Sequence, residues 1–176
     1  MNAIQVIAET RHLRFVQRGT WAFVQRTNNS DVVCIMAVTD EDKLLLVEQY
    51  RPPVDCRVVE FPAGLVGDLP GEQDEPLEKA ARRELTEETG YQAQMIERVF
   101  SGASSAGLTD EMMTFFLASG LKKIHEGGGD ETEQITVHEV PRDEVNKWLE
   151  KRVQEGCQVD ARVYAGLYFL QREKTS

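Results

Sequence analysis

The sequence of 176 residues contains only three cysteines, which lie far apart at positions 34, 56 and 157. No two of them form a Cys-x-x-Cys pair, so the sequence predicts neither a disulfide framework nor a structural zinc site. Few and unpaired cysteines are typical of proteins in a reducing compartment. We therefore expect a cytoplasmic protein.

Long apolar runs are missing as well. The first residues, MNAIQVIAETRHLRF, lack the apolar core of a secretory signal peptide. No apolar run in the sequence reaches the roughly 20 residues that a membrane-spanning helix needs. The sequence therefore predicts no membrane partner.

Positive charge is scarce, because 20 Lys and Arg residues stand against 30 Asp and Glu residues and give a formal net charge of −10. Nucleic acids and anionic membranes bind basic surfaces, so this composition argues against both as partners. Hydrophobic residues make up 41% of the chain and charged residues 28%, which is ordinary for a soluble globular protein. The length suits one domain with a core and a small appendage.

The residue patterns predict an α/β chain. Residues 12–26 mix aromatic, β-branched and polar residues around a Gly-Thr pair, which predicts two short strands joined by a turn. The turn residues TNNSD at 27–31 predict a boundary between an N-terminal β region, residues 1–30, and the main domain, residues 31–176. The continuous apolar run at 32–39 predicts a strand buried on both faces. Further strands are expected at 44–50, 58–61, 94–101, 112–118 and 134–140, and helices at 77–90, 141–156 and 160–173.

Three glutamates share one face of the strongest predicted helix. Glu84, Glu87 and Glu88 lie three or four residues apart or side by side, and each like-charge pair at such spacing costs about 0.2–0.5 kcal/mol in an isolated helix. Arg83 precedes Glu87 by four residues but cannot neutralise three carboxylates. A hard divalent cation such as Mg²⁺ or Mn²⁺ can, since it prefers carboxylate oxygens. The alternative is a solvated acidic face, which is the usual role of such charge runs.

The segment EPLEKAARRELTEETGY, residues 75–91, resembles the Nudix box, GX5EX7REUXEEXGU, in which U is a bulky apolar residue. Every position from Glu75 to Tyr91 matches at the required spacing, but the first glycine of the box does not. Its strict position is Leu69, and the counterpart Gly64 lies five residues too early. The segment GLVGDLPGEQDE thus carries an insertion, and we expect a longer loop there that leaves the helix carboxylates in place.

The resemblance extends beyond the box. The segments LLLVEQYRPPV, VVEFPAG and VYAGLYFL look like the Nudix branch that hydrolyses ADP-ribose and nucleoside diphosphate sugars. The resemblance implies a Nudix α/β/α sandwich around a mixed sheet, with a short N-terminal antiparallel β region. It also implies a homodimer, with residues 12–26 at the interface. The implied reaction cuts the diphosphate of ADP-ribose or GDP-mannose to a nucleoside monophosphate and a sugar phosphate.

The resemblance implies a set of metal ligands with Mg²⁺ or Mn²⁺ as the cofactor. Two or three ions would polarise the diphosphate and lower the pKa of a bound water. Arg83 and Glu75 would support this site, and an ordinary helix salt bridge is compatible with that role for Arg83. The implied ligands are Glu84, Glu87, Glu88 and the main-chain carbonyl of Ala63.

A general base must still activate the water, and in related enzymes it is often a glutamate on a loop after the box. The segment GGGDETEQ offers Glu131 and Glu133, and its glycines would let the loop close over the substrate. Glu133 is favoured because it lies nearer the strand expected at 134–140. A solvated acidic loop remains the alternative for either residue.

Four further residues are candidates for substrate contact. Arg51 and Arg57 flank a proline loop and could pair with phosphate oxygens, although arginine is also common on ordinary surfaces. Trp21 could stack on a nucleobase across the dimer interface, and packing is the alternative. Glu111 follows a Ser-Ala-Gly triplet at 105–107, where the related enzymes often have Ser-Pro-Gly, and could lie near the substrate or metal. The missing proline puts strict ADP-ribose selectivity in doubt and widens the expected range to GDP-mannose.

Two other functions stay open. One is a Nudix hydrolase of nucleoside triphosphates or dinucleoside polyphosphates. The other is a module that binds ADP-ribose without cleaving it. Such modules tend to lose the glutamates of the box, whereas this sequence keeps them.

Overall fold

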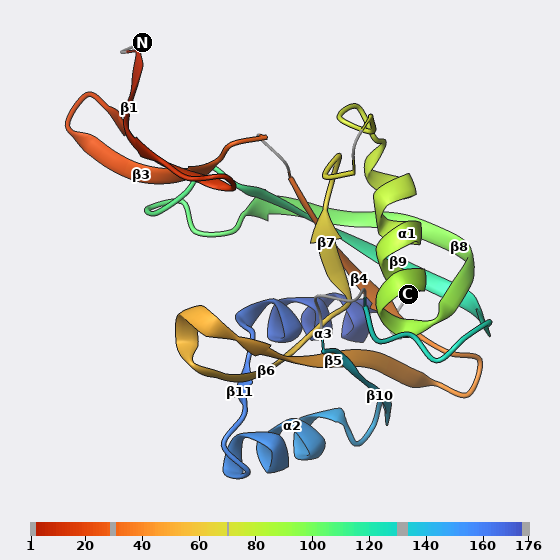
Figure 1. The fold of residues 1–176 in the computed structure, drawn as a ribbon. Helices are drawn as coiled ribbons and strands as arrows, with labels where there is room; N and C mark the ends of the chain where they lie inside the picture. Colours follow the sequence, from red (N-terminus) through yellow and green to blue (C-terminus); the bar gives the residue numbers. More distant parts are fainter. Residues whose placement is uncertain (1–2, 29–30, 70, 130–133, 174–176) are drawn as a thin grey trace.

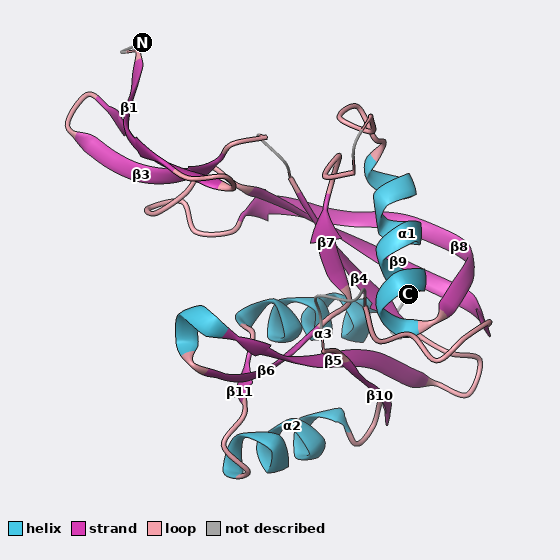
Figure 2. Ribbon diagram, viewed as in Figure 1, coloured by secondary structure: helices cyan, strands magenta, loops and turns pink. Residues whose placement is uncertain are grey.

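A computed structural model describes residues 3–28, 31–69, 71–129 and 134–173. Within these ranges the chain forms three β-sheets and three α-helices, which confirms the predicted α/β class (Figure 1, Figure 2). None of the described helices is both long enough and apolar enough to cross a membrane.

The N-terminal sheet consists of β1 (Ile4–Glu9), β2 (Leu13–Arg18) and β3 (Trp21–Arg26), paired antiparallel in that order. Gly19, with φ of 62°, lies in the turn between β2 and β3, so the predicted hairpin is confirmed. The sequence did not predict β1, and all six of its residues are exposed, so it has no pattern of core-facing residues. Figure 1 shows this sheet extending away from the other two.

The second sheet is mixed and has the strand order β7-β4-β9-β8. β4 (Val32–Ala37) runs parallel to β9 (Met112–Lys123) and antiparallel to β7 (Ala63–Leu65). β8 (Tyr91–Ala103) pairs antiparallel with β9 along its whole length. This long pairing extends both strands beyond the predicted 94–101 and 112–118.

The third sheet has the order β10-β5-β6-β11. β5 (Lys43–Arg51) pairs antiparallel with β10 (Thr136–Pro141) and with β6 (Cys56–Glu60). β11 (Gln158–Val159) joins parallel to β6, and a 3-10 turn, Pro52–Val54, connects β5 to β6.

The helices are α1 (Leu77–Thr89), α2 (Val145–Gln154) and α3 (Ala161–Glu173). The prediction for α1 is confirmed at both ends to within a residue. α2 begins later than the expected 141–156, because Pro141 still pairs with Lys43 as the last residue of β10.

β4 is buried on both faces, as predicted. Val33 and Ile35 pack in one hydrophobic cluster with the apolar side of α1. Cys34 and Met36 pack in another hydrophobic cluster with α2 and α3. α1 also contacts β7 and β8, so the two sheets and three helices share β4 as the centre of the core. This packing fixes α1 beside β7, which Figure 1 shows lying along the helix.

Candidate active site

The glutamate motif lies on α1, whose sequence LEKAARRELTEET consists largely of strong helix formers. Ala80, Ala81 and Leu85 anchor the helix in the core. The helix ends at Gly90, whose φ of 77° suits glycine and whose N–H donates to the carbonyl of Thr86 at 2.9 Å. The predicted glycine stop is therefore confirmed.

The segment 125–129 packs against the last turn of α1. The N–H of Gly128 donates to the carbonyl of Glu88 at 2.8 Å, and that of Gly129 donates to the carbonyl of Glu87 at 3.2 Å. The glycine-rich loop therefore starts beside the backbone that carries two of the three glutamates.

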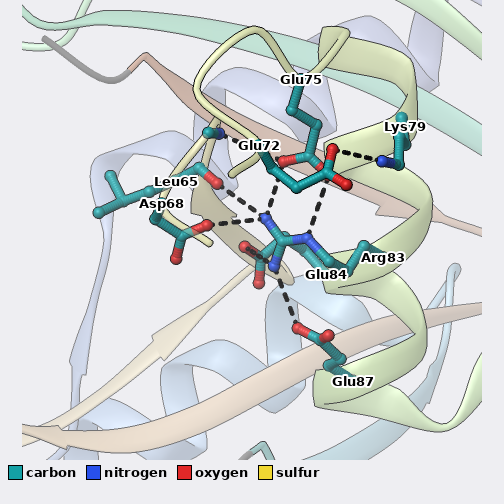
Figure 3. Close-up of polar contacts among 9 residues, drawn as sticks. Leu65, Asp68, Glu72, Glu75, Lys79, Arg83, Glu84 and Glu87 are labelled. Atoms are coloured by element: carbon teal, nitrogen blue, oxygen red, sulfur yellow. Dashed lines mark hydrogen bonds and ion pairs between the residues drawn. The ribbon is translucent and has the colours of Figure 1, made fainter. Parts of the chain in front are cut away.

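The guanidinium of Arg83 is the centre of the motif (Figure 3). Its Nη1 donates to Glu84 Oε1 at 2.8 Å and to Glu87 Oε2 at 3.1 Å. Its Nε and Nη2 donate to the two carboxylate oxygens of Glu75 at 3.2 and 3.1 Å. Burial alone would lower the pKa of Arg83, but the neighbouring carboxylates outweigh it and raise this pKa.

The longer loop expected before the helix is present between Leu65 and Leu77. It reaches back to the motif, because Nη2 of Arg83 also donates to the carbonyl of Leu65 and to Asp68 Oδ1, each at 3.0 Å. Glu75 accepts the N–H of Gly67 at 3.2 Å. The hydrogen bond from Arg83 holds the pKa of Glu75 below its usual value, so this carboxylate stays charged.

Gly64 on β7 makes room for the carboxylate of Glu84. A Cβ atom at Gly64 would lie 1.9 Å from the carboxylate carbon of Glu84, so a side chain there would have to displace this carboxylate. Glu84 is buried, and this burial raises its pKa to about 7, while Arg83 opposes the shift and the charges of Asp68 and Glu87 add to it. The buried carboxylate thus has less positive charge around it than its ionised form requires.

Glu88 is buried and fixes the start of β7. Its Oε2 accepts the N–H of Ala63 at 3.0 Å, so the carboxylate and the Ala63 backbone lie in direct contact. The structure thus brings together the two elements, α1 and β7, from which the predicted metal ligands come.

The donor set on α1 and β7 fits a hard divalent cation. Three carboxylates lie on α1, two of them buried, and that of Glu84 fits against Gly64 of β7; such oxygens suit Mg²⁺ or Mn²⁺. In the described ranges, however, no three His, Cys, Asp or Glu side chains are already grouped to hold an ion. Arg83 Nη1 instead lies against Glu84 and Glu87 and provides the counter-charge.

Arg51 and Arg57 flank the 3-10 turn of the β5–β6 hairpin, and each lies in its own ion pair. Arg51 pairs with the buried Glu60 at 2.8 Å, and Arg57 pairs with the buried Glu48 at 2.5 Å. Both arginine side chains remain 39% exposed. Arg57 also donates to Thr136 at 3.2 Å, at the start of β10, so it is tied to the strand that follows the acidic loop.

Trp21 and Glu111 connect the N-terminal sheet to the main domain. The indole Nε1 of Trp21 donates to the carbonyl of Gly107 at 3.1 Å, and the ring remains 61% exposed. Glu111 pairs with Arg26 of β3 at 2.6 Å. The loop that carries the Ser-Ala-Gly triplet therefore supports the N-terminal sheet.

Glu131 and Glu133, the two candidates for the general base, lie outside the described residues. Sequence reasoning did not single out Asp68, although it contacts Arg83 directly. Asp68 belongs to the insertion, where no motif spacing applies. The only sign in the sequence that Asp68 belongs to the site was that it is an acidic residue in a loop next to the Nudix box.

Comparison with known proteins agrees with this geometry. The NUDIX domain family matches residues 28–157. The methanol dehydrogenase activator of Bacillus methanolicus is 39% identical over 137 residues, covering 77% of this chain and 71% of that protein. The ADP-ribose pyrophosphatase of Bacillus subtilis (strain 168) is 39% identical over 121 residues, covering 68% of this chain and 63% of that protein. The GDP-mannose pyrophosphatase of Cronobacter sakazakii is 35% identical over 140 residues, covering 75% of this chain and 68% of that protein.

Among solved structures, the fold resembles that of a protein described as an ADP compounds hydrolase, with a TM-score of 0.68. The superposition covers 97% of this chain and 90% of that chain at 22% identity, so the likeness concerns the fold. The family match spans more than half of the sequence and includes β7, the inserted loop and all of α1. This chain belongs to the NUDIX domain family.

Proposed function

We propose that this protein hydrolyses the diphosphate bond of nucleoside diphosphate sugars and releases a nucleoside monophosphate and a sugar phosphate. ADP-ribose would give AMP and ribose 5-phosphate, and GDP-mannose would give GMP and mannose 1-phosphate. Relatives named ADP-ribose pyrophosphatase and GDP-mannose pyrophosphatase support this substrate class. The observation that carries the proposal is the arrangement of the glutamates on α1. Glu84 and Glu87 both contact Arg83, and the carboxylate of Glu84 lies against Gly64.

The cofactor in this proposal is Mg²⁺ or Mn²⁺, held by Glu84, Glu87, Glu88 and the carbonyl of Ala63. When bound, the cation polarises the diphosphate, neutralises developing charge and lowers the pKa of a water. Glu88 keeps β7 against α1 through its bond to the N–H of Ala63. This contact keeps the ligands on the two elements in register.

Other residues bind the substrate or move a proton. Arg51 and Arg57, whose side chains remain 39% exposed beside their ion pairs, contact phosphate. Trp21 stacks on the base with its exposed ring. A glutamate of the acidic loop, Glu133 or else Glu131, takes the proton from the attacking water. Glu111 lies near the substrate or the metal ion.

The proposal includes a cytoplasmic homodimer joined through the N-terminal β region, residues 1–30, with residues 31–176 as the hydrolase domain. Exposed apolar side chains on β1 and β2 support this, since Val6 and Phe15 remain 49% and 43% exposed in the single chain. A second copy would cover them and would place each N-terminal sheet near its partner.

The decisive experiment is a panel of ADP-ribose, GDP-mannose, UDP-glucose, NADH and dATP, assayed with Mg²⁺ and with Mn²⁺. We expect cleavage of the sugar nucleotides to monophosphates and sugar phosphates, and much slower turnover of dATP. Comparable turnover of dATP without cleavage of sugar nucleotides would instead indicate a nucleoside triphosphate hydrolase. Binding of ADP-ribose without any cleavage would indicate a sensor.

A further inference from the structure

The guanidinium of Arg83 has two functional edges. The Nη1 edge faces the proposed metal ligands and contacts Glu84 and Glu87. The edge formed by Nε and Nη2 faces the inserted loop and contacts Glu75 and Asp68. The first edge binds the two carboxylates that a cation would need. The second edge binds two carboxylates on the side of the inserted loop (Figure 3).

A cation that binds Glu84 and Glu87 must therefore compete with Nη1 of Arg83. The arginine yields more easily if its charge remains paired elsewhere, because a buried and unpaired guanidinium is costly. The side chain of Arg83 is only 14% exposed, so water alone cannot replace the lost partners. Glu75 compensates part of its charge, and Asp68 is the second carboxylate on the same edge.

We propose that Asp68, supplied by the insertion between β7 and α1, is a positioning residue for the divalent metal site. It retains the guanidinium of Arg83 on the Glu75 side, so that Glu84 and Glu87 become available to Mg²⁺ or Mn²⁺. This inference rests on the proposed function, and it assigns a role to a residue that the Nudix box does not contain. Without the charge of Asp68, Arg83 holds Glu84 and Glu87 more tightly and the cation binds more weakly.

The chain offers a matched control in the same loop. Glu72 also comes from the insertion and also forms an ion pair, but its partner is Lys79, at 2.6 Å. Asp68 and Glu72 are comparably exposed, at 35% and 42%. Asp68→Asn and Glu72→Gln therefore remove the same charge from the same loop, but only the first one removes a direct partner of Arg83.

The test is calorimetric titration of the full-length protein with MnCl2 in the absence of substrate. We expect Asp68→Asn to weaken Mn²⁺ binding about tenfold, at the low end of the roughly 10- to 100-fold losses for direct partners of metal ligands, because Asp68 acts through Arg83. Glu72→Gln should change it less than twofold. In assays, Asp68→Asn should raise the Mn²⁺ concentration for half-maximal activity in parallel, while kcat at saturating Mn²⁺ stays within twofold of wild type.

Equal Mn²⁺ affinity of Asp68→Asn and wild type would overturn the inference, as would an equal loss in both variants. Thermal unfolding in EDTA checks that Asp68→Asn remains folded, and Asp68→Glu, which keeps the charge, should restore most of the affinity. If wild type bound no Mn²⁺ at all, the proposed metal-dependent function would fail first. If wild type bound Mn²⁺ and cleaved sugar nucleotides while Asp68→Asn behaved identically, only the role of Asp68 would be wrong.

Discussion

Gly64 and Glu84 lie so close together that a methyl group on Gly64 would be 1.9 Å from the carboxylate carbon of Glu84. The contact joins β7 to α1 across the inserted loop. It gives a physical role to a glycine at this position, because a side chain here would displace the Glu84 carboxylate, even though the spacing of the Nudix box places the glycine elsewhere. The requirement is for space beside a carboxylate, not for an unusual backbone conformation.

Gly64→Ala should therefore displace the Glu84 side chain. We expect Mn²⁺ affinity to fall more than tenfold and kcat/KM to fall with it, and overpacking should lower the free energy of unfolding by about 1–3 kcal/mol. Calorimetry with MnCl2 and steady-state assays measure both. Gly107→Ala is the control, because a Cβ there meets nothing within 4 Å. Wild-type metal binding in Gly64→Ala would contradict the role of this contact.

Glu88→Gln tests the metal assignment directly. The amide oxygen can still accept the N–H of Ala63, so the contact that holds β7 is kept and the fold should survive. The lost charge should lower kcat about 10²- to 10³-fold, as loss of one electrostatic stabiliser does. Glu78→Gln removes a charge from the exposed side of the same helix, where Glu78 pairs with Arg82, and should leave kcat unchanged. Wild-type turnover in Glu88→Gln would exclude Glu88 as a ligand.

The helix that carries the site was predictable because its signals are local. Helix formers, the apolar positions 77, 80, 81 and 85, and the glycine stop at 90 all lie within 14 residues of sequence, and the structure reproduces them. The buried strand β4 was predictable for a similar reason, since a continuous apolar run needs cover on both faces.

The environment of the site was less predictable because it depends on contacts between distant residues. Asp68 reaches Arg83 only through the path of the inserted loop, and Arg51 and Arg57 are paired by carboxylates on the facing strand. Strand β1 escaped prediction because every residue in it is exposed. A sequence pattern records which face is buried, but it does not record which partner a charged side chain finds.

Glu84 should make the metal-free protein sensitive to pH. Burial raises its pKa from an ordinary 4.5 to about 7. Below about pH 4.5 the carboxyl is protonated in both the folded and the unfolded protein. Between pH 4.5 and 7 the unfolded chain loses this proton while the folded protein keeps it, so the free energy of unfolding falls progressively. Above the folded pKa both states are ionised and the decrease is complete. The ionised carboxylate then costs no more than roughly 3–4 kcal/mol.

Glu84→Gln should therefore raise the unfolding temperature in EDTA at pH 8 and should do so much less at pH 5. Thermal unfolding followed by circular dichroism at the two pH values measures the difference. Added MnCl2 should reverse the order at pH 8, because wild type keeps the ligand and the variant does not. A variant that is less stable than wild type at pH 8 in EDTA would show that Arg83 already compensates the charge.

The general base can be assigned by comparing Glu133→Gln with Glu131→Gln. Loss of a general base typically costs 10²- to 10⁴-fold in rate, and we expect about that loss in kcat for Glu133→Gln. Mn²⁺ affinity should stay unchanged in both variants, which separates this role from that of a ligand. Full activity in both would place the base outside the acidic loop. A large loss in Glu131→Gln alone would assign the role to Glu131.

Phe15→Glu should separate the proposed dimer. Phe15 is 43% exposed on β2, in the sheet that extends from the main domain (Figure 1), and a buried charge there would oppose association. Light scattering after size exclusion should give twice the chain mass of 19.9 kDa for wild type and the single mass for the variant. Val54→Glu is the control, since Val54 is 47% exposed but lies in the 3-10 turn between β5 and β6.

The same variant tests whether Trp21 serves the site of the partner. If it does, the Phe15→Glu monomer should show a KM raised about tenfold or more, because one stacked base contributes about 1–3 kcal/mol to binding. Its Mn²⁺ affinity should equal that of wild type, because the proposed ligands on α1 and β7 come from one chain. A wild-type monomer would remove the dimer from the proposal. A monomeric variant with unchanged KM would leave the dimer in place and would exclude a shared site, because each chain would then bind its substrate alone.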